Sequence, residues 1–293
     1  MPSLGDYLNK PEYLFRPSQV ARRLARALRA KRASAVVTLP WRLPLRIRIA
    51  DDIGRALWTT GVYDLAVSEA LWRLIEPGDT VVDAGANIGY MTSLMVARAG
   101  AAGTVWAFEP HPALFAELAA NRERWRAPGH AAVELRELAL SDRPRDTVLV
   151  EGAAFAANRG TARVADGDAP GIGIHLSTLD AELPVAARLG VLKVDVEGHE
   201  AAVLRGATQL LAKRAIRDIV YEEHQPDSDS TALLRSRGYQ IFDIRKRLFG
   251  PALEVPGRGR APAWMPPSRL ASADPERARA RLARRGWRCL GGC

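Results

Sequence analysis

Short apolar strands alternate with longer helical stretches from residue 80 onwards, and this alternation constrains the fold more than any other feature of the sequence. Strands are expected over 80–84, 104–108, 133–138, 191–196, 216–221 and 239–244, with helical patterns between them over 88–99, 112–125, 200–213 and 230–237. Repeated strand–helix–strand units favour right-handed crossovers and parallel strands covered by helices on both faces. The sequence therefore predicts the α/β class, with a doubly wound, mostly parallel sheet.

The segments that flank this region differ from it in charge. The chain of 293 residues carries a formal net charge of +9, but eleven basic and two acidic residues lie in 1–50 and nine basic and two acidic residues lie in 255–293. The middle of the chain is mildly acidic. We therefore expect a basic N-terminal extension (1–61), a central domain (62–250) and a Pro/Arg-rich C-terminal extension (251–293). The first extension should contain an amphipathic helix over 18–33, suited to dimerisation or to covering a cleft, and a strand or hairpin over 35–49.

Composition excludes several classes of protein. No apolar run approaches the ~18 residues that a membrane span needs, and the N-terminus lacks the charged-then-apolar pattern of a signal peptide. The two cysteines, Cys289 and Cys293, both lie in the last five residues, so a disulfide framework is excluded and the ligands are too few for a zinc site. We expect a cytoplasmic protein.

Acidic residues follow three successive predicted strands. The first strand leads into Asp83-Ala-Gly85-Ala-Asn-Ile-Gly89, whose G-x-x-x-G spacing differs from the G-x-G-x-x-G of dinucleotide sites. Glu109 ends the second strand, where it can accept hydrogen bonds from ribose hydroxyls, and Asp142 follows the third, within reach of an adenine amino group. Open parallel sheets bind ligands beyond the carboxyl ends of their strands. The three acids together suit a ligand with a cation, a ribose and an adenine but no phosphate. S-adenosylmethionine is a cofactor with these parts.

The fourth strand carries four ionisable side chains in a central position of the sheet. Lys193 and Asp195 share one face by the period of two and can form an ion pair. Asp195, Glu197 and His199 should reach the ligand crevice. His199 is the candidate general base, because imidazole ordinarily titrates near neutrality and an adjacent carboxylate can orient it.

The fifth strand ends in a further acid and a further histidine. We expect Glu222 and His224 to orient the substrate at the same rim. In a less favoured alternative, Asp195 and Glu222, with or without His224, bind Mg²⁺, which would acidify the acceptor hydroxyl. The favoured hypothesis needs no metal ion.

Five motifs, in this order, resemble the FkbM-type methyltransferase family. They are V-V-D-A-G-A-N-I-G-Y (81–90), F-E-P-H-P-A-L-F-A-E-L-A-A-N (108–121), A-L-S-D (139–142), S-T-L-D (177–180) and L-K-V-D-V-E-G-H-E-A-A-V-L-R-G-A (192–207). The resemblance covers about residues 62–245. It implies a class I, Rossmann-like, S-adenosylmethionine-dependent methyltransferase, in a family that commonly methylates hydroxyl groups of sugars, polyketide-derived rings or other secondary metabolites.

The resemblance also assigns roles by position. It implies a cofactor loop, a ribose acid and an adenine-side acid, formed by Asp83, Gly85, Asn87, Gly89, Glu109 and Asp142. It implies an inner polar strand and a substrate rim, formed by Lys193, Asp195, Glu197, His199, Glu222 and His224. The loop Asn158-Arg159-Gly160 resembles a family loop near the site, which makes Asn158 a candidate substrate contact.

The resulting hypothesis is O-methylation of a small-molecule or glycan-like acceptor by a chain that can form a homodimer. His199 would take the hydroxyl proton while Asp195 or Glu197 holds the imidazole. The alternative is a nucleic-acid methyltransferase or binder that uses the arginine-rich ends, although the core is acidic and the N/D-P-P-Y/F motif is absent. A nicotinamide-dependent oxidoreductase is disfavoured by the missing G-x-G-x-x-G.

Overall fold

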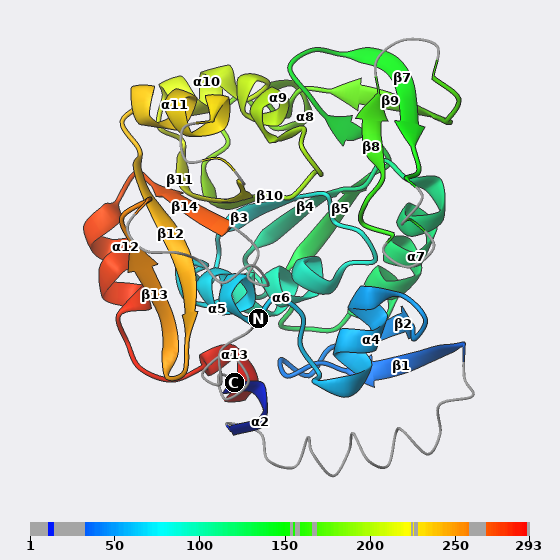
Figure 1. Cartoon of the computed structure of the whole chain (residues 1–293), viewed down its shortest axis with the longest axis vertical. Helices are drawn as coiled ribbons and strands as arrows, with labels where there is room; N and C mark the ends of the chain where they lie inside the picture. The colour runs from blue at the N-terminus through cyan, green and yellow to red at the C-terminus, as the bar shows by residue number, and fades with distance from the viewer. Residues whose placement is uncertain are drawn as a thin grey trace.

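The computed structural model describes residues 11–14, 33–152, 155, 159–165, 169–223, 225, 228–257 and 268–291. An eight-stranded sheet lies at its centre, in the order β13-β12-β14-β11-β10-β3-β4-β5 (Figure 1). The strands are β3 (Thr80–Ala84), β4 (Thr104–Phe108), β5 (Ala132–Arg136), β10 (Leu189–Val194), β11 (Ile216–Glu222), β12 (Gln240–Arg247), β13 (Gly250–Glu254) and β14 (Ser268–Ser272). The run from β11 to β5 is parallel throughout. The predicted α/β class with a mostly parallel sheet is confirmed.

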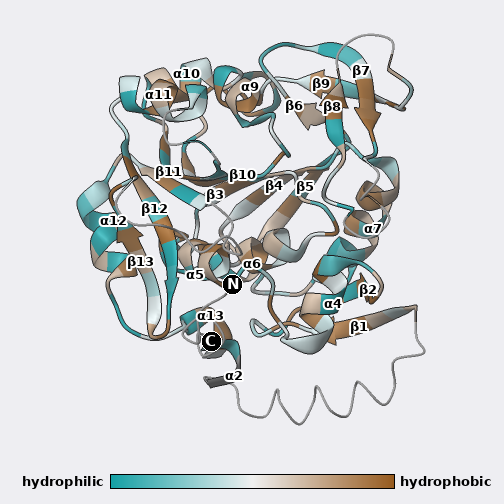
Figure 2. Cartoon of the chain, viewed as in Figure 1, coloured by the Kyte–Doolittle hydropathy of each residue, from teal (hydrophilic) through white to brown (hydrophobic). Residues whose placement is uncertain are grey.

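Helices cover both faces of this sheet, because successive strand residues point to opposite sides. Val81 belongs to one buried apolar cluster and its neighbour Val82 to the other. The first cluster includes α5 (Leu65–Leu74), α6 (Tyr90–Ala99) and α7 (Pro112–Glu123), and the second includes α8 (Leu179–Glu182), α9 (Glu200–Arg205), α10 (Thr208–Ala212) and α11 (Asp229–Ser236). Figure 1 shows α8 to α11 above the sheet and α5 and α6 below it. The strands between them are largely hydrophobic (Figure 2).

The C-terminal segment returns to the sheet. β14 pairs antiparallel with both β11 and β12, so β12 runs in the same direction as β11. The sequence pattern did not predict this strand. Its five residues are all buried, and they include Arg269, which lies 3.3 Å from Asp243 Oδ1 and donates to Thr231 Oγ1 at 2.7 Å. Residues 251–293, expected as an extension, thus supply a strand to the interior of the sheet, followed by α12 (Pro275–Leu282) and α13 (Arg288–Gly291).

Two smaller units flank the main sheet. The segment between β5 and β10 forms a four-stranded sheet of β6 (Ala139–Leu140), β7 (Arg145–Val150), β8 (Arg163–Ala165) and β9 (Ile172–Ser177). Of the strand or hairpin predicted over 35–49, the structure has the hairpin, formed by β1 (Ser34–Thr38) and β2 (Pro44–Arg48). It buries Leu45 and Ile47 and leads into α4 (Asp52–Thr59). The short helix α2 (Pro11–Leu14) precedes it. Residues 18–32 of the expected basic helix lie outside the described residues.

None of the helices in the described parts of the chain combines the length and the apolar composition that crossing a bilayer requires.

A buried ion pair fastens the C-terminal end to α5. Arg73 Nε lies 2.5 Å from Glu69 Oε1, with both side chains almost fully buried. Glu69 also accepts the backbone N–H groups of Arg288 and Cys289, at 2.9 and 2.8 Å. The Arg73 guanidinium donates to the backbone carbonyls of Arg281, Leu282, Arg284 and Gly286. Glu69 and Arg73 of α5 therefore hold the backbone of residues 281–289 in place.

We expect Glu69→Gln to lower the free energy of unfolding by about 3 kcal/mol, because the substitution leaves the buried Arg73 charge without its carboxylate. Urea denaturation followed by circular dichroism measures this change. Glu123→Gln removes an exposed carboxylate at the end of α7 and is the control, for which we expect little change. Equal midpoints for the two variants would contradict a role of the pair in stability.

Candidate active site

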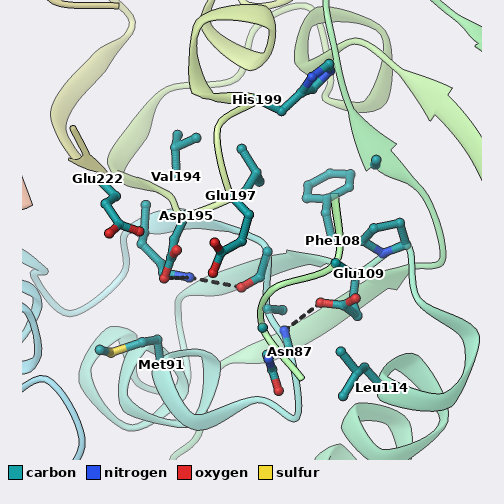
Figure 3. A pocket seen from close by; sticks show the side chains of 18 of the residues that line it. Asn87, Met91, Phe108, Glu109, Leu114, Val194, Asp195, Glu197, His199 and Glu222 are labelled. Atoms are coloured by element: carbon teal, nitrogen blue, oxygen red, sulfur yellow. Dashed lines mark hydrogen bonds and ion pairs between the residues drawn. The ribbon is translucent and has the colours of Figure 1, made fainter. Parts of the chain in front are cut away.

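A cavity of about 430 Å³ opens at the carboxyl ends of β3, β4, β10 and β11. Figure 3 shows the side chains that line it, contributed by the loops after these strands and by α6 and α7. Residues 159–164 of the smaller sheet and its preceding loop line a further wall. The cavity therefore lies at the edge of the sheet that the strand pattern indicated.

Two glycines let the loop after β3 approach its neighbours closely. Gly85 has φ +78°, and a Cβ there would lie 1.9 Å from the carbonyl oxygen of Asp195. Gly89 has φ +94°, and a Cβ there would lie 2.6 Å from the ring of Trp125. Between them, Asn87 takes a left-handed conformation with φ +51°. These positions fix a tight backbone turn in the cavity wall, directly before α6.

Glu109 is fixed at the end of β4 by two backbone donors. The N–H of Asn87 donates to Oε2 at 2.7 Å (dashed in Figure 3), and the N–H of His111 donates to Oε1 at 2.9 Å. Burial raises the pKa of Glu109 to about 7, although both backbone hydrogen bonds favour the ionised form. Each carboxylate oxygen keeps a lone pair for a further donor. The predicted ribose acid thus lies in the cavity wall with a defined orientation.

Lys193 and Asp83 form a buried ion pair behind the glycine loop. Lys193 Nζ lies 3.0 Å from Asp83 Oδ1 and 3.5 Å from Asp195 Oδ2, and it donates to the carbonyl of Gly85 at 3.0 Å. Burial alone would lower the pKa of Lys193, but the two carboxylates raise it. Asp83 also accepts from Thr92 Oγ1 at 2.6 Å. The predicted Lys193–Asp195 pair is present, and Asp83, expected next to a ligand cation, neutralises Lys193 and does not line the cavity.

Three of the predicted carboxyl groups converge at the end of the cavity opposite Glu109. Asp195 and Glu197 follow β10, Glu222 ends β11, and Figure 3 shows their carboxyl groups close together. Burial raises the pKa of Glu222 to about 8, with further contributions from Asp195 and Glu197, and a hydrogen bond with Asp195 acts in the same direction. Burial also raises the pKa of Glu197, whose φ is +54°. We call these three residues and Asp64 the carboxyl cluster.

Asp64 belongs to this cluster but was missed in the sequence. Its side chain accepts the backbone N–H of Val67 at 3.2 Å and so caps α5, while its backbone has φ +36°. Burial raises the pKa of Asp64 to about 6. Tyr63 lines the cavity beside it. The one local signal, an acidic residue before a helical pattern, indicates a helix cap and not a site.

His199 and Asp142 lie apart from the carboxyl cluster. His199 lines the cavity, and its Nε2 is 2.9 Å from Ser141 Oγ; Figure 3 shows the imidazole away from Asp195 and Glu197. The expected contact between His199 and one of those carboxylates stays a prediction. Asp142 is exposed, 3.8 Å from Arg205 Nε, and is not a lining residue.

Apolar side chains also line the cavity. Phe108 and Leu114 lie on the side of Glu109 in Figure 3, and the lining further includes Leu138, Leu140 and Leu149.

Two of the predicted site residues, Asn158 and His224, lie outside the described residues. Within the described residues, no group of three or more His, Cys, Asp or Glu side chains has the arrangement of a metal site. The Mg²⁺ alternative, with Asp195 and Glu222 as ligands and His224 as an optional third, stays a prediction.

Arg159 clamps the wall that the smaller sheet contributes. Its guanidinium makes a bidentate pair with Glu117 of α7, at 2.8 and 3.0 Å, and Nε lies 3.5 Å from Asp51 Oδ2. Asp51 is the N-cap of α4, where its Oδ1 accepts the N–H of Gly54 at 2.6 Å. A bidentate arginine–carboxylate pair fixes orientation as well as distance. One side chain thus joins the smaller sheet, α7 and the N-terminal unit at the cavity.

The comparisons with known proteins agree on one family. The model of the methyltransferase FkbM domain matches residues 83–241. The 31-O-demethyl-FK506 methyltransferase FkbM of Streptomyces tacrolimicus is 34% identical over 210 residues, which are 60% of this chain and 78% of that protein. The hexuronic acid methyltransferase AglP of Haloferax volcanii is 33% identical over 167 residues, which are 56% of this chain and 65% of that protein.

Similarity to solved structures is more distant. A SAM-dependent O-methyltransferase from Thermotoga maritima shares 15% identity with a TM-score of 0.40, covering 71% of this chain and 63% of that chain. Fibrillarin from Aeropyrum pernix, in complex with S-adenosyl-L-methionine, shares 13% identity with a TM-score of 0.39, covering 82% of this chain and 94% of that chain.

We expect Arg159→Gln to weaken binding of S-adenosylmethionine about tenfold, because the wall over the cavity loses its charged clamp. Glu117→Gln should change binding in the same direction but less, since Asp51 remains. Isothermal titration measures affinity, and hydrogen exchange of residues 159–165 reports the release of the wall. Arg126→Gln, on an exposed arginine after α7, is the control. Unchanged affinity and exchange in Arg159→Gln would show that the clamp does not position this wall.

Proposed function

The chain belongs to the methyltransferase FkbM family, and from this premise we propose that it transfers a methyl group from S-adenosylmethionine to a hydroxyl group of a small-molecule or sugar-like acceptor. The observation that carries the proposal is a single cavity with two chemically different ends. One end has the glycine loop, Glu109 and an apolar wall, and the other has the carboxyl cluster, with His199 also lining the cavity. Two relatives act on a 31-O-demethyl-FK506 and on a hexuronic acid, by their names.

The residues at the first end fit S-adenosylmethionine. The glycine loop permits close approach of a ligand to the backbone, and the fixed carboxylate of Glu109 can accept two ribose hydroxyls. The apolar wall with Phe108 and Leu138 suits an adenine ring. Carboxylates at the opposite end suit a positive charge and would repel a pyrophosphate. When bound, S-adenosylmethionine supplies a methyl group on a positively charged sulfur.

The chain's own residues must hold the acceptor hydroxyl in line with that methyl group, remove its proton and exclude water. Carboxylates of the cluster can accept hydrogen bonds from acceptor hydroxyls and so orient them. We assign proton removal to His199, which lines the cavity and is held by Ser141 at 2.9 Å. Glu222 is the second candidate base, because burial raises its pKa to about 8 and so makes its carboxylate a stronger proton acceptor.

A nucleic-acid acceptor is not part of the proposal. Arginines of the C-terminal segment are used inside the molecule: Arg277 lies 2.9 Å from both Glu76 and Asp218, and Arg281 also pairs with Glu76. Arginines that neutralise the protein's own carboxylates have less charge to offer to phosphates. Folding contacts therefore account for Arg277 and Arg281 in this arginine-rich segment.

The test of the proposed function is ligand binding as a function of pH. We expect S-adenosylmethionine, and not NAD or NADP, to raise the melting temperature. Hydroxyl donors favour the ionised form of Glu109, whose pKa is about 7 in the free protein, so affinity should increase from pH 5.5 to about 7.5 and then level off.

Isothermal titration measures this profile, and Glu109→Gln should flatten it and weaken binding. Glu134→Gln, which removes an exposed carboxylate on β5, should leave the profile unchanged. A rise in melting temperature with NAD but not with S-adenosylmethionine would overturn the proposed function.

We expect His199→Ala to lower turnover by ~10²–10⁴ while binding of S-adenosylmethionine changes little, since a general base contributes about this much. Single-turnover methyl transfer, monitored by mass spectrometry, measures the effect. Glu222→Gln in parallel separates the two candidate bases. Turnover of His199→Ala near the wild-type value, together with loss in Glu222→Gln, would move the assignment to Glu222.

A further inference from the structure

We propose that the turn between β12 and β13, together with the segment that joins α12 to α13, is a docking surface for a membrane that carries anionic lipids. None of the residues that form this surface lines the cavity, and the inference does not depend on the proposed function. It rests on an exposed aromatic side chain that is held next to a segment with three exposed arginines.

The turn presents a large apolar side chain to solvent. Phe249 lies between β12 and β13 and is 58% exposed, and Leu248 before it is half-buried. Within the described residues, the exposed large hydrophobic side chains are Val36, Val185, Phe249 and Val255, and Phe249 is the aromatic one among them. Figure 1 shows this turn at the lower edge of the molecule. The ring is therefore available to a partner.

The segment between α12 and α13 is fixed against this turn. The N–H of Gly286 donates to the carbonyl of Phe249 at 2.7 Å, and Nε1 of the buried Trp287 donates to the carbonyl of Leu248 at 3.0 Å. Gly250 has φ +136°, and a Cβ there would lie 3.1 Å from the carbonyl oxygen of Gly286. The turn and the segment therefore form one continuous surface.

The same segment carries exposed positive charge. Its exposed arginines are Arg284, Arg285 and Arg288. None of the three has an ion-pair partner in the part of the chain that the structure describes, and residues 277–293 contain no aspartate or glutamate. Arg277 and Arg281, by contrast, pair with Glu76. We call Phe249 and the three exposed arginines the tip patch.

The carboxylates of the neighbouring elements are already paired. Glu254 of β13 pairs with Arg247 and lies 3.7 Å from Arg245, both on β12. Glu12 of α2 lies 3.0 Å from Lys246, also on β12. These carboxylates offset the charges of β12 and leave those of the tip patch without a counter-charge. The tip patch therefore has an excess of positive charge beside an exposed aromatic ring.

This combination fits the surface of an anionic membrane. Anionic head groups favour arginines near the surface by about fivefold in binding for each one, and an apolar side chain gains when it leaves water for the interface. Single-stranded nucleic acids are instead bound in a groove of cations with aromatic platforms, whereas Phe249 lies on a turn at the edge of the molecule. A lipid surface uses both the charge and the ring.

Binding to vesicles tests the proposal. The full-length protein is mixed with vesicles of phosphatidylcholine alone, or of phosphatidylcholine with the anionic lipid phosphatidylglycerol, and bound protein is measured by sedimentation. We expect binding to the vesicles with phosphatidylglycerol, which weakens as salt is added, and little binding to phosphatidylcholine alone. No binding to the anionic vesicles, or equal binding to both kinds, would overturn the proposal.

The role of the ring is tested by two substitutions. We expect Phe249→Ser to weaken binding to the anionic vesicles about tenfold, because the apolar contribution is lost, and Phe249→Trp to retain it, because tryptophan favours the membrane interface. Val185→Ser removes another exposed apolar side chain and is the control, for which we expect no change. Unchanged binding in Phe249→Ser would show that the turn does not enter the membrane.

The role of the arginines is tested by a triple variant. We expect Arg284→Gln, Arg285→Gln and Arg288→Gln together to weaken binding to the anionic vesicles about 100-fold, the product of three such contributions. Their side chains are exposed, so folding should be unaffected.

The matched control removes the same net charge from other elements. It combines Arg124→Gln, Arg126→Gln and Arg143→Gln, three exposed arginines at the end of α7 and between β6 and β7, and should bind nearly as the wild type. Equal losses in the two triple variants would show that net charge, and not the tip patch, is responsible.

A fluorescent single-stranded RNA is titrated in parallel. We expect the tip-patch variant and the control variant to bind this RNA alike. Binding of the RNA that is lost in the tip-patch variant alone, by a protein that does not bind the vesicles, would overturn the lipid assignment in favour of a nucleic acid.

Discussion

The buried pair of Lys193 and Asp83 is the interaction on which the rest of the site depends. Its 3.0 Å contact joins the ends of β10 and β3, and the same ammonium donates to the carbonyl of Gly85. A buried charge is tolerated only when it is partnered and hydrogen-bonded. The pair therefore fixes the glycine loop against β10, where a Cβ on Gly85 would overlap the carbonyl of Asp195. Cavity shape and the position of Asp195 both follow from this contact.

The carboxyl cluster shows the complementary situation. Asp64, Glu197 and Glu222 all line the cavity, and burial raises the pKa of each. Such an arrangement opposes folding, and perturbed carboxyl groups in a cavity are typical of sites that bind or transfer protons. Positive φ values at Asp64 and Glu197 lie in the same region. Strain and repulsion are thus concentrated where the proposed reaction needs acceptor groups.

Several features could be predicted from the sequence because their signals are local. The apolar runs of β3, β4, β10 and β11 and the glycines at 85 and 89 indicated the fold and the edge of the sheet that holds the cavity. Strand β14 could not be predicted, since Ser-Arg-Leu-Ala-Ser lacks an apolar period and its buried Arg269 is compensated by Asp243, 26 positions away. Asp64 gave only the signal of a helix cap. Arg159 was noticed only as part of a loop, and its clamp to Glu117 depends on a contact across 42 positions.

The sequence by itself determined the fold class, the family resemblance and which strand ends carry acids, because strand periodicity and the common edge of parallel strands are encoded locally. Only the tertiary structure decided which charged and polar side chains contact one another. It paired Asp83 with Lys193, placed His199 against Ser141, turned Arg159 to Glu117 and left Asp142 in solvent. The physical reason is that ion pairing and pKa depend on burial and on distances of a few ångströms between residues far apart in the chain, and packing alone sets those distances.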